Sequence, residues 1–262
     1  MTSMKIARLL TALAIFSPGV PGAAVTLNLG AADSFAVLAG STVTNASNTI
    51  IRGDIGVWPG SAITGFPPGL VAVGGVHAGN AVAMVAQASL AVAYSAAAGQ
   101  ACEVVLTGQD LGGLTLTPGV YCFGSSSQLT GVLTLDGQGD ASAVFLFQMG
   151  STLTTANASS VLLINGAQGE NLFWQVGSSA TLGTNTQFAG SILALASITL
   201  NTGASIDFGR ALAQTGAVTL DGNRVTAVAV PEPGTLSLLL PGLLLLFRGR
   251  SNRVRAFHRP RR

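Results

Sequence analysis

The chain has 262 residues and few charges, with 12 Lys and Arg against 10 Asp and Glu and a formal net charge of +2. Most of the basic residues lie near the two ends, so residues 25–229 hold three arginines against nine carboxylates, a net charge of −6. This balance excludes the basic footprint of a nucleic-acid-binding protein. The frequent Val, Ile, Leu and Phe exclude a disordered chain, and the length of the central segment fits one domain.

The first 24 residues have the pattern of a secretory signal peptide. Lys5 and Arg8 precede an apolar run from Leu9 to Phe16, and the small residues Gly22-Ala23-Ala24 follow. This is the order of parts in a cleavable export signal. The pattern predicts export and removal of residues 1–24, and the alternative is a short anchor helix that is retained.

An alanine-rich stretch, Asn80 to Ala98, follows strand-like runs that are broken by glycines. Val82, Ala86, Leu90 and Ala93 recur in steps of three and four, and this spacing predicts a helix. Asn80 can cap its beginning and Gly99 can end it. Such a helix would be about 28 Å long, which is enough to lie along the domain and cover one side.

Cys102 and Cys122 are the two cysteines of the sequence. In an exported domain, a disulfide between them would close a loop of about 20 residues and contribute about 3 kcal/mol by the chain-entropy model. Spacing alone does not show that the two residues are close in space. Two unpaired cysteines acting as small apolar residues are therefore the alternative.

The second half of the domain repeats a Thr-Leu pair. The pairs are Thr115-Leu116, Thr134-Leu135, Thr152-Leu153, Thr181-Leu182, Thr199-Leu200 and Thr219-Leu220, with intervals of 19, 18, 29, 18 and 20 residues. A period near 20 is typical of a solenoid, alternating runs such as 143–147 predict strands, and clusters such as 136–140 predict corners. The sequence therefore predicts a parallel β-helix of triangular section, with each Leu pointing inward and each preceding Thr pointing outward.

The last 33 residues, 230–262, differ in composition from the domain. Pro231, Glu232 and Pro233 precede a leucine-rich run from 234 to 247, and seven arginines follow. This order resembles the PEP-CTERM sorting signal. The resemblance implies a short transmembrane segment that an exosortase-type sorting enzyme cleaves at the inner membrane of a Gram-negative bacterium, leaving the protein secreted or at the cell surface. The alternative is an ordinary C-terminal anchor.

The domain resembles microbial ice-binding proteins of the adhesin-like type. The resemblance rests on STVTNASNTIIRGDIGVWPGSAITGFPPG at 41–69 and on TPGVYCF, FQMGSTLTTANASSVLLINGAQ, NLFWQVGSSATLGTNTQFAGSILA and SITLNTGAS, and it covers most of 25–229. It implies a right-handed, discontinuous parallel β-helix with one long α-helix packed alongside. It also implies adsorption to an ice crystal surface through a flat solenoid face, with inhibited growth or recrystallisation.

Some members of that family carry a Thr-(Ala/Gly)-x-(Thr/Asn) pattern on this face, which Thr202-Gly203-Ala204-Ser205 approaches. Thr is suited to such a face because its hydroxyl anchors ordered water and its side chain is stiff at χ1. Thr ladders that only stabilise a sheet by cross-strand pairing are the alternative. The candidate ice-contacting residues are Thr152, Thr154, Thr155, Asn157, Thr181, Thr184, Thr186, Thr199, Thr202, Ser205 and Thr219.

The sequence predicts no enzyme, metal site or cofactor, because it lacks a nucleophile elbow, a phosphate loop and a Cys and His cluster. Asp136 and Asp140 are more typical of a corner, and Phe173-Trp174 of a core strand. The main hypothesis is an exported ice-binding protein. The alternative is a cell-surface or extracellular-matrix structural protein associated with exopolysaccharide, which a face interrupted by Asp136, Asp221 or bulky side chains would favour.

Overall fold

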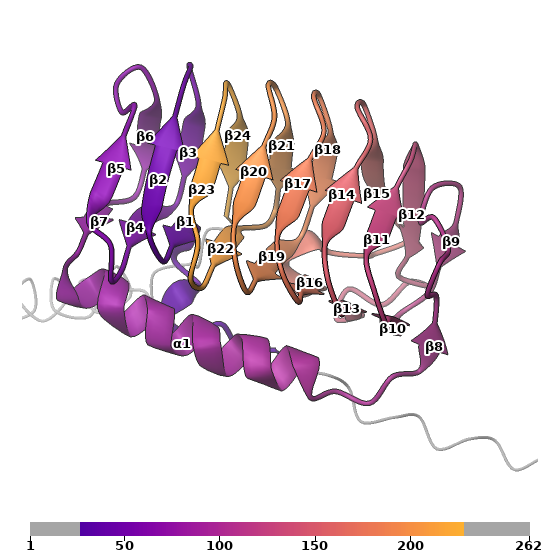
Figure 1. The fold of residues 1–262 in the computed structure, drawn as a ribbon. Coiled ribbons are helices and arrows are strands. Elements are labelled where there is room, and N and C mark those ends of the chain that lie inside the picture. Colours follow the sequence, from indigo (N-terminus) through magenta and orange to yellow (C-terminus); the bar gives the residue numbers. More distant parts are fainter. Residues whose placement is uncertain (1–26, 228–262) are drawn as a thin grey trace, which may run out of the picture.

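Short alternating segments separated by glycine-containing corners make three strands per coil, and the coils stack into a three-faced solenoid (Figure 1). The computed structural model describes residues 27–227. The predicted signal peptide at 1–24 and the predicted sorting tail at 230–262 lie outside the described residues. The predicted domain of mostly β structure with a triangular section is confirmed.

The strands form three parallel sheets, one for each face of the solenoid. Sheet A has the spatial order β7 (Val76–Ala78), β4 (Asp54–Val57), β1 (Phe35–Ala39), β22 (Ala211–Ala213), β19 (Ser191–Ala194), β16 (Leu172–Val176), β13 (Phe145–Met149), β10 (Gly119–Phe123) and β8 (Val104–Val105).

Sheet B has the order β11 (Ser127–Leu129), β14 (Leu153–Thr155), β17 (Ala180–Leu182), β20 (Ile198–Leu200), β23 (Val218–Leu220), β2 (Thr42–Asn45) and β5 (Ala62–Thr64). Sheet C has the order β6 (Leu70–Val73), β3 (Ile50–Arg52), β24 (Arg224–Thr226), β21 (Ser205–Asp207), β18 (Gln187–Ala189), β15 (Ser160–Ile164), β12 (Val132–Asp136) and β9 (Thr115–Leu116). Two short 3-10 helices, η1 (Gly30–Ala32) and η2 (Gly169–Asn171), complete the elements.

The coils are not stacked in the order of the sequence. The first strand, β1, lies between β4 and the late strand β22, so the beginning and the end of the described chain pair directly. The helix α1 (Ala81–Ala98) carries the chain from the β5–β7 end to the opposite end, from which the later coils return (Figure 1). This arrangement is the discontinuous solenoid that the family resemblance implies.

The solenoid interior is filled by the inward residue of each strand. Leu135, Leu153, Leu182, Leu200 and Leu220 are buried as predicted, and Leu116 is partly buried. Four aromatic rings, three from neighbouring strands of sheet A and one from β18 of sheet C, also contact one another in the interior. Phe147 and Trp174 stack with ring centroids 4.2 Å apart, and Tyr121 and Phe188 extend the contacts on either side. The prediction that Trp174 lies in the core is confirmed.

A second apolar layer joins α1 to the outer side of sheet A. Leu146, Phe173, Leu193 and Leu212 point away from the interior and pack against Ala86, Leu90, Ala93 and Ala97 of the helix. The predicted helix is confirmed, but Val82, one of the four residues whose spacing predicts it, does not lie on its buried side. Val82 is 50% exposed, because Ala83, one position later, faces the sheet.

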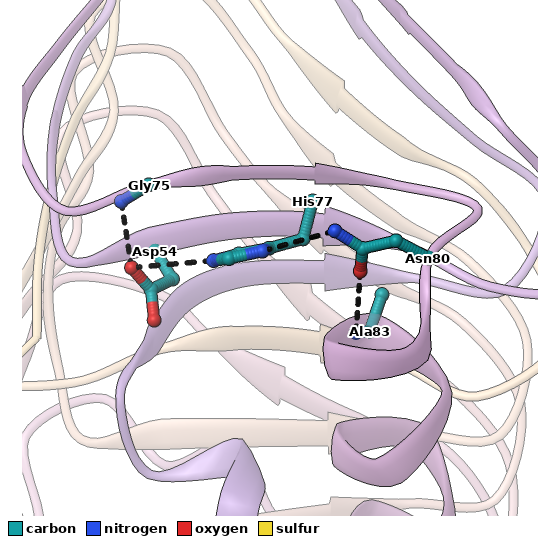
Figure 2. A network of polar contacts seen from close by, with 5 residues as sticks. All are labelled: Asp54, Gly75, His77, Asn80 and Ala83. Atoms are coloured by element: carbon teal, nitrogen blue, oxygen red, sulfur yellow. Dashed lines mark hydrogen bonds and ion pairs between the residues drawn. The ribbon is translucent and has the colours of Figure 1, made fainter.

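The beginning of α1 is held by a small polar network (Figure 2). As predicted, the side chain of Asn80 caps the helix, its Oδ1 accepting from Ala83 N at 3.0 Å. Its Nδ2 lies 3.3 Å from His77 Nδ1, and His77 Nε2 faces Asp54 Oδ1 at 3.7 Å. Because Asp54 also accepts from Gly75 N, the network connects β4, β7 and the helix.

A disulfide and an ion pair also connect separate segments of the fold. Cys102 and Cys122 form a disulfide, so the segment after α1 is attached to β10 and the alternative of two unpaired cysteines is excluded. Arg210 is buried beside β22 and pairs with Asp33 Oδ1 at 2.6 Å, which fixes the N-terminal segment to a late coil. Burial lowers the pKa of Arg210 below its ordinary value, although the Asp33 carboxylate opposes that shift.

The interior ring contacts generate a stability prediction. Trp174→Ala removes the central ring and its Nε1 bond to Ala189 O, and we expect it to lower the free energy of unfolding by about 3–5 kcal/mol. Leu162→Ala, at an exposed position on sheet C, is the control and should change it by less than about 0.5 kcal/mol. Urea unfolding measures both variants, and equal losses would contradict the packing described.

Candidate functional site

Within residues 27–227, only one of the three solenoid faces is both uncovered and uncharged. Sheet A is covered by α1. Sheet C carries Arg52, Asp207 and Arg224, together with the exposed side chains of Ile50 and Leu70. Sheet B, which faces the viewer in Figure 1, has no charged residue in any of its strands.

The outward side chains of sheet B form a ladder of threonines, one from each strand except the first. The strand registers place these residues directly opposite one another, from the β11 end to the β5 end: Gln128, Thr154, Thr181, Thr199, Thr219, Thr44 and Thr64. We call these seven residues the threonine ladder. Coils stack at about 4.8 Å, so the ladder is about 29 Å long.

A second row of small residues lies beside the ladder, two positions before each ladder residue in the chain. It consists of Ser126, Thr152, Ser179, Ser197, Ala217, Thr42 and Ala62, and we call it the small-residue row. Its register follows from the pairing of Thr42 with Ala62 and from the bond of 3.0 Å between the hydroxyls of Thr152 and Ser126. Sheet B therefore presents two parallel rows without a charge and without a bulky apolar side chain.

The ladder is regular because the residue before each threonine is fixed in the interior. Val43, Leu153, Ala180, Ile198 and Val218 are buried, and Ile63 is partly buried at the end of the sheet. Successive side chains of a strand point to opposite sides, so burying one residue turns the next outward. The core thus sets the position and direction of each ladder threonine.

The predicted ice-contacting residues fall into three groups. Thr152, Thr154, Thr181, Thr199 and Thr219 lie on the outer surface of sheet B. Asn157, Thr184 and Thr202 lie in the connections between sheets B and C, where Thr184 N donates to Asn157 Oδ1. The structure does not place this second group on the sheet B face.

The third group, Thr155, Thr186 and Ser205, is buried and cannot contact an external surface. Thr155 and Thr186 hydroxyls lie 2.8 Å apart, and Thr155 Oγ1 also accepts from Gly183 N at 2.8 Å. These contacts are internal support for the turn between β17 and β18. Including these three residues in the candidate surface was wrong, because hydroxyl content alone does not distinguish a surface threonine from one bonded inside a corner.

The Thr-Leu pairs recur along the coils of the solenoid, but they do not all lie on the same face. Thr115 and Thr134 lie in sheet C, where they pair with each other. Thr152-Leu153 is shifted by two positions, since Thr154 rather than Thr152 pairs with Thr181. Thr155 therefore occupies the interior position that leucine occupies in the following coils.

Sequence reasoning missed Thr42, Thr44 and Thr64 of the early coils. The shared signal is an Ala or larger aliphatic residue followed by threonine, as in Val43-Thr44, Ile63-Thr64, Ile198-Thr199 and Val218-Thr219. Reading the residue before each threonine would have connected the early and late coils. These early threonines are not followed by leucine, so the Thr-Leu repeat did not include them.

Two carboxylates were expected to decide whether the face is interrupted. Asp136 lies at the end of β12 in sheet C. Asp221 follows β23 at the corner between sheets B and C, where it accepts from the hydroxyl of Thr202. Neither one stands in the threonine ladder or the small-residue row. Among residues 27–227 there is also no group of three metal-ligating side chains.

The fold and this surface define a parallel β-solenoid with one uncovered, uncharged face lined by threonines. The family model described as Ice-binding-like matches residues 37–226. The chain belongs to this ice-binding-like family.

Several relatives are similar over most of their length. An ice-binding protein of Nostoc sp. (strain HG1) is 51% identical, covering 90% of this chain and 91% of the relative. The crystal structure of an ice-binding protein from the Antarctic ascomycete Antarctomyces psychrotrophicus matches with a TM-score of 0.75 and 47% identity, over 78% of this chain and 99% of the other. An ice-binding protein from an Arctic yeast, solved as the structural basis for antifreeze activity, matches at 0.74 with 33% identity, over 80% and 97% of the two chains.

Thr154 and Thr155 are adjacent in the sequence, but Thr154 is exposed and Thr155 is buried, so substitutions at the two positions form a matched test of the site geometry. We expect Thr155→Val to lower the free energy of unfolding by about 1–3 kcal/mol, because it leaves Gly183 N without its buried acceptor. Thr154→Val alters an exposed side chain and should cost less than about 0.5 kcal/mol. Chemical denaturation measures both, and the reverse order of losses would show that the register of β14 is wrong.

Proposed function

We propose that the protein binds ice crystals through the threonine ladder and the small-residue row of sheet B, and so restrains ice growth and recrystallisation. The observation that carries the proposal is six threonines in continuous register on an uncharged face. Family membership and the relatives named as ice-binding proteins support it. The function involves no chemical reaction.

The physical argument concerns what an ice surface offers. It is a fixed lattice of water molecules without net charge, so a charged side chain would have to exchange its own strong hydration for poorly placed partners. A threonine hydroxyl can both donate to and accept from ordered water, while the methyl group limits competing hydrogen bonds. The stiff χ1 of threonine reduces the entropy lost on docking. The backbone ladder of sheet B supplies the rigidity that lets many weak contacts act together.

We also infer that the mature protein works outside the cytoplasm. Residues 1–24 have the pattern of an export signal, and the Cys102–Cys122 disulfide suits an oxidising compartment. Residues 231–233 and the following segment support recognition by an exosortase-type enzyme after transient membrane anchoring. In this arrangement the domain 25–229 would act as a secreted or surface-attached unit.

The alternative of a matrix protein without ice activity was expected to show an interrupted face. The two rows of sheet B contain no carboxylate, no arginine and no aromatic side chain. This surface favours ice over the matrix alternative as the principal target. The sorting tail is the only feature that supports exopolysaccharide as a second proposed partner.

A double substitution in the centre of the ladder tests the proposal. We expect the full chain to keep ice crystals small in a frozen sucrose film, and Thr181→Tyr with Thr199→Tyr to remove most of this effect at the same concentration. Two tyrosines would hold neighbouring hydroxyls and water away from the ice lattice. Both threonines lie on adjacent strands, so the disturbance is local.

Gln187→Tyr with Ser160→Tyr is the matched control, since these residues pair on adjacent strands of sheet C. It should retain the wild-type effect on crystal size. If the control pair loses activity and the ladder pair retains it, ice binding would have been assigned to the wrong face. If the wild-type protein leaves crystal growth unchanged at micromolar concentration, the proposed function is wrong.

A further inference from the structure

The helix α1 has an apolar outer face as well as an apolar inner one. Val82, Met84, Val85 and Val92 are between 42% and 70% exposed, and we call these four residues the outer strip. Residues 81–98 contain no charged side chain, and the helix runs along the length of the solenoid (Figure 1). A helix that is apolar all round is normally buried, so the outer strip points to a contact beyond residues 27–227.

The end of the described chain lies at a corner beside the face that α1 covers. Thr226 ends β24 of sheet C, and Ala227 N donates to Arg52 O at 2.9 Å. Arg52 ends β3 of sheet C and Asp54 begins β4 of sheet A, so Ala227 lies at the corner between these sheets. The chain therefore leaves the domain between the α1 face and the outer face of sheet C.

The leucine-rich run of the tail begins only a short distance along the chain from this corner. Six residues separate Ala227 from Gly234, and this connection spans at most about 25 Å when it is fully extended. Sheet A, with nine strands at about 4.8 Å, is about 38 Å wide. If the run enters a bilayer, the connection holds the domain against the membrane, with one of the two faces beside the corner turned toward the lipid.

Charge distinguishes these two faces. The outer face of sheet C carries Arg52 and the exposed ion pair of Arg224 and Asp207, whose Nη2 and Oδ2 atoms are 2.9 Å apart. Charged groups lose hydration at high cost when they leave water, whereas exposed valines gain from leaving it. The α1 face is therefore the better match for an apolar medium.

The carboxylates in the segments that flank α1 do not oppose such a contact. Asp33 pairs with Arg210 at 2.6 Å, and Glu103 accepts from Val120 N at 3.0 Å. Both carboxylates lie outside residues 81–98. The side chains that the helix itself turns to the lipid are all uncharged.

We propose that the outer strip of α1 lies on the surface of the lipid bilayer while the tail anchors the protein. The inference rests on the membrane anchoring proposed for the tail, and it adds the face by which the domain meets the lipid. An interfacial helix buries its apolar face about 5–10 Å into the boundary of headgroups and acyl chains. Because α1 has no Lys or Arg, the contact needs the tether, which holds the strip at a high effective concentration near the membrane. Sheet B is a different face of the solenoid and stays turned to the medium.

Site-specific fluorescence quenching tests this contact. The full chain is reconstituted into phosphatidylcholine vesicles, and an introduced cysteine carries the environment-sensitive dye NBD. Both native cysteines form a disulfide, so the introduced cysteine is the only free thiol. Lipids with a nitroxide near the headgroup should quench the dye at Val92→Cys about threefold more strongly than at Leu162→Cys of sheet C or Thr199→Cys of sheet B, because only α1 enters the interface.

Charges introduced on the outer strip give a second test. Val85→Asp with Val92→Asp should reduce the quenching of a dye at Ala88→Cys to the level seen on sheet C. Both aspartates replace exposed side chains, so thermal unfolding should be unchanged. Val132→Asp with Leu162→Asp replaces two exposed apolar residues of sheet C and is the matched control. It should leave the quenching at Ala88→Cys as strong as in the wild-type background.

A variant of the tail tests the dependence on anchoring. Leu244→Arg with Leu245→Arg places two charges in the leucine-rich run and should abolish the quenching at Val92→Cys. If the wild-type protein does not float with the vesicles in a density gradient, the anchoring is wrong and this inference is overturned with it.

Two other outcomes overturn the inference alone. Stronger quenching at Leu162→Cys than at Val92→Cys would place sheet C on the bilayer. A dye at Val92→Cys that is blue-shifted but not quenched would show that a second copy or another segment of the chain covers the outer strip. None of these measurements involves ice, so the ice proposal keeps its own test.

Discussion

The in-register stacking of parallel coils is the constraint on which the rest of the structure depends. Each strand has one inward residue that the core fixes and one outward residue that follows from it. A slip of one residue would turn every ladder threonine into the interior and bring an aliphatic side chain to the surface. The apolar interior, with its leucines and stacked rings, therefore stabilises the domain and also specifies the geometry of an exposed polar face.

The three faces of the solenoid have different surroundings, and these differences explain why the chain has so few charged residues. Sheet A contributes apolar residues on both of its sides, because it packs against the interior and also against the helix α1. Sheet C carries four charged strand residues, Arg52, Asp136, Asp207 and Arg224, the last two as an ion pair. Sheet B is kept free of charge. Because the coils are not stacked in sequence order, β2 and β5 lie beside β23. The threonines of these early strands therefore extend the ladder formed by the late coils.

Much of the architecture could be predicted because it repeats. The near-constant spacing of Thr-Leu pairs indicated the coils, and the capped alanine-rich stretch indicated α1. The membership of the face could not be predicted as well, because it depends on register. Thr155 and Thr186 are the same residue type as the threonines on the exposed face, but they are buried at a corner of the solenoid. Thr44 and Thr64 join the ladder only through pairing between distant parts of the chain.

The measurement that tests the central claim most directly is the partition of protein into slowly growing ice. Part of a solution of the full chain is frozen onto a cold surface, and the protein in the ice is compared with that in the remaining liquid. The account predicts that the wild type enters the ice, while Thr199→Tyr in the middle of the ladder stays mainly in the liquid. A wild-type protein that is excluded from ice, or a Thr199→Tyr variant that enters it equally, would contradict adsorption through sheet B.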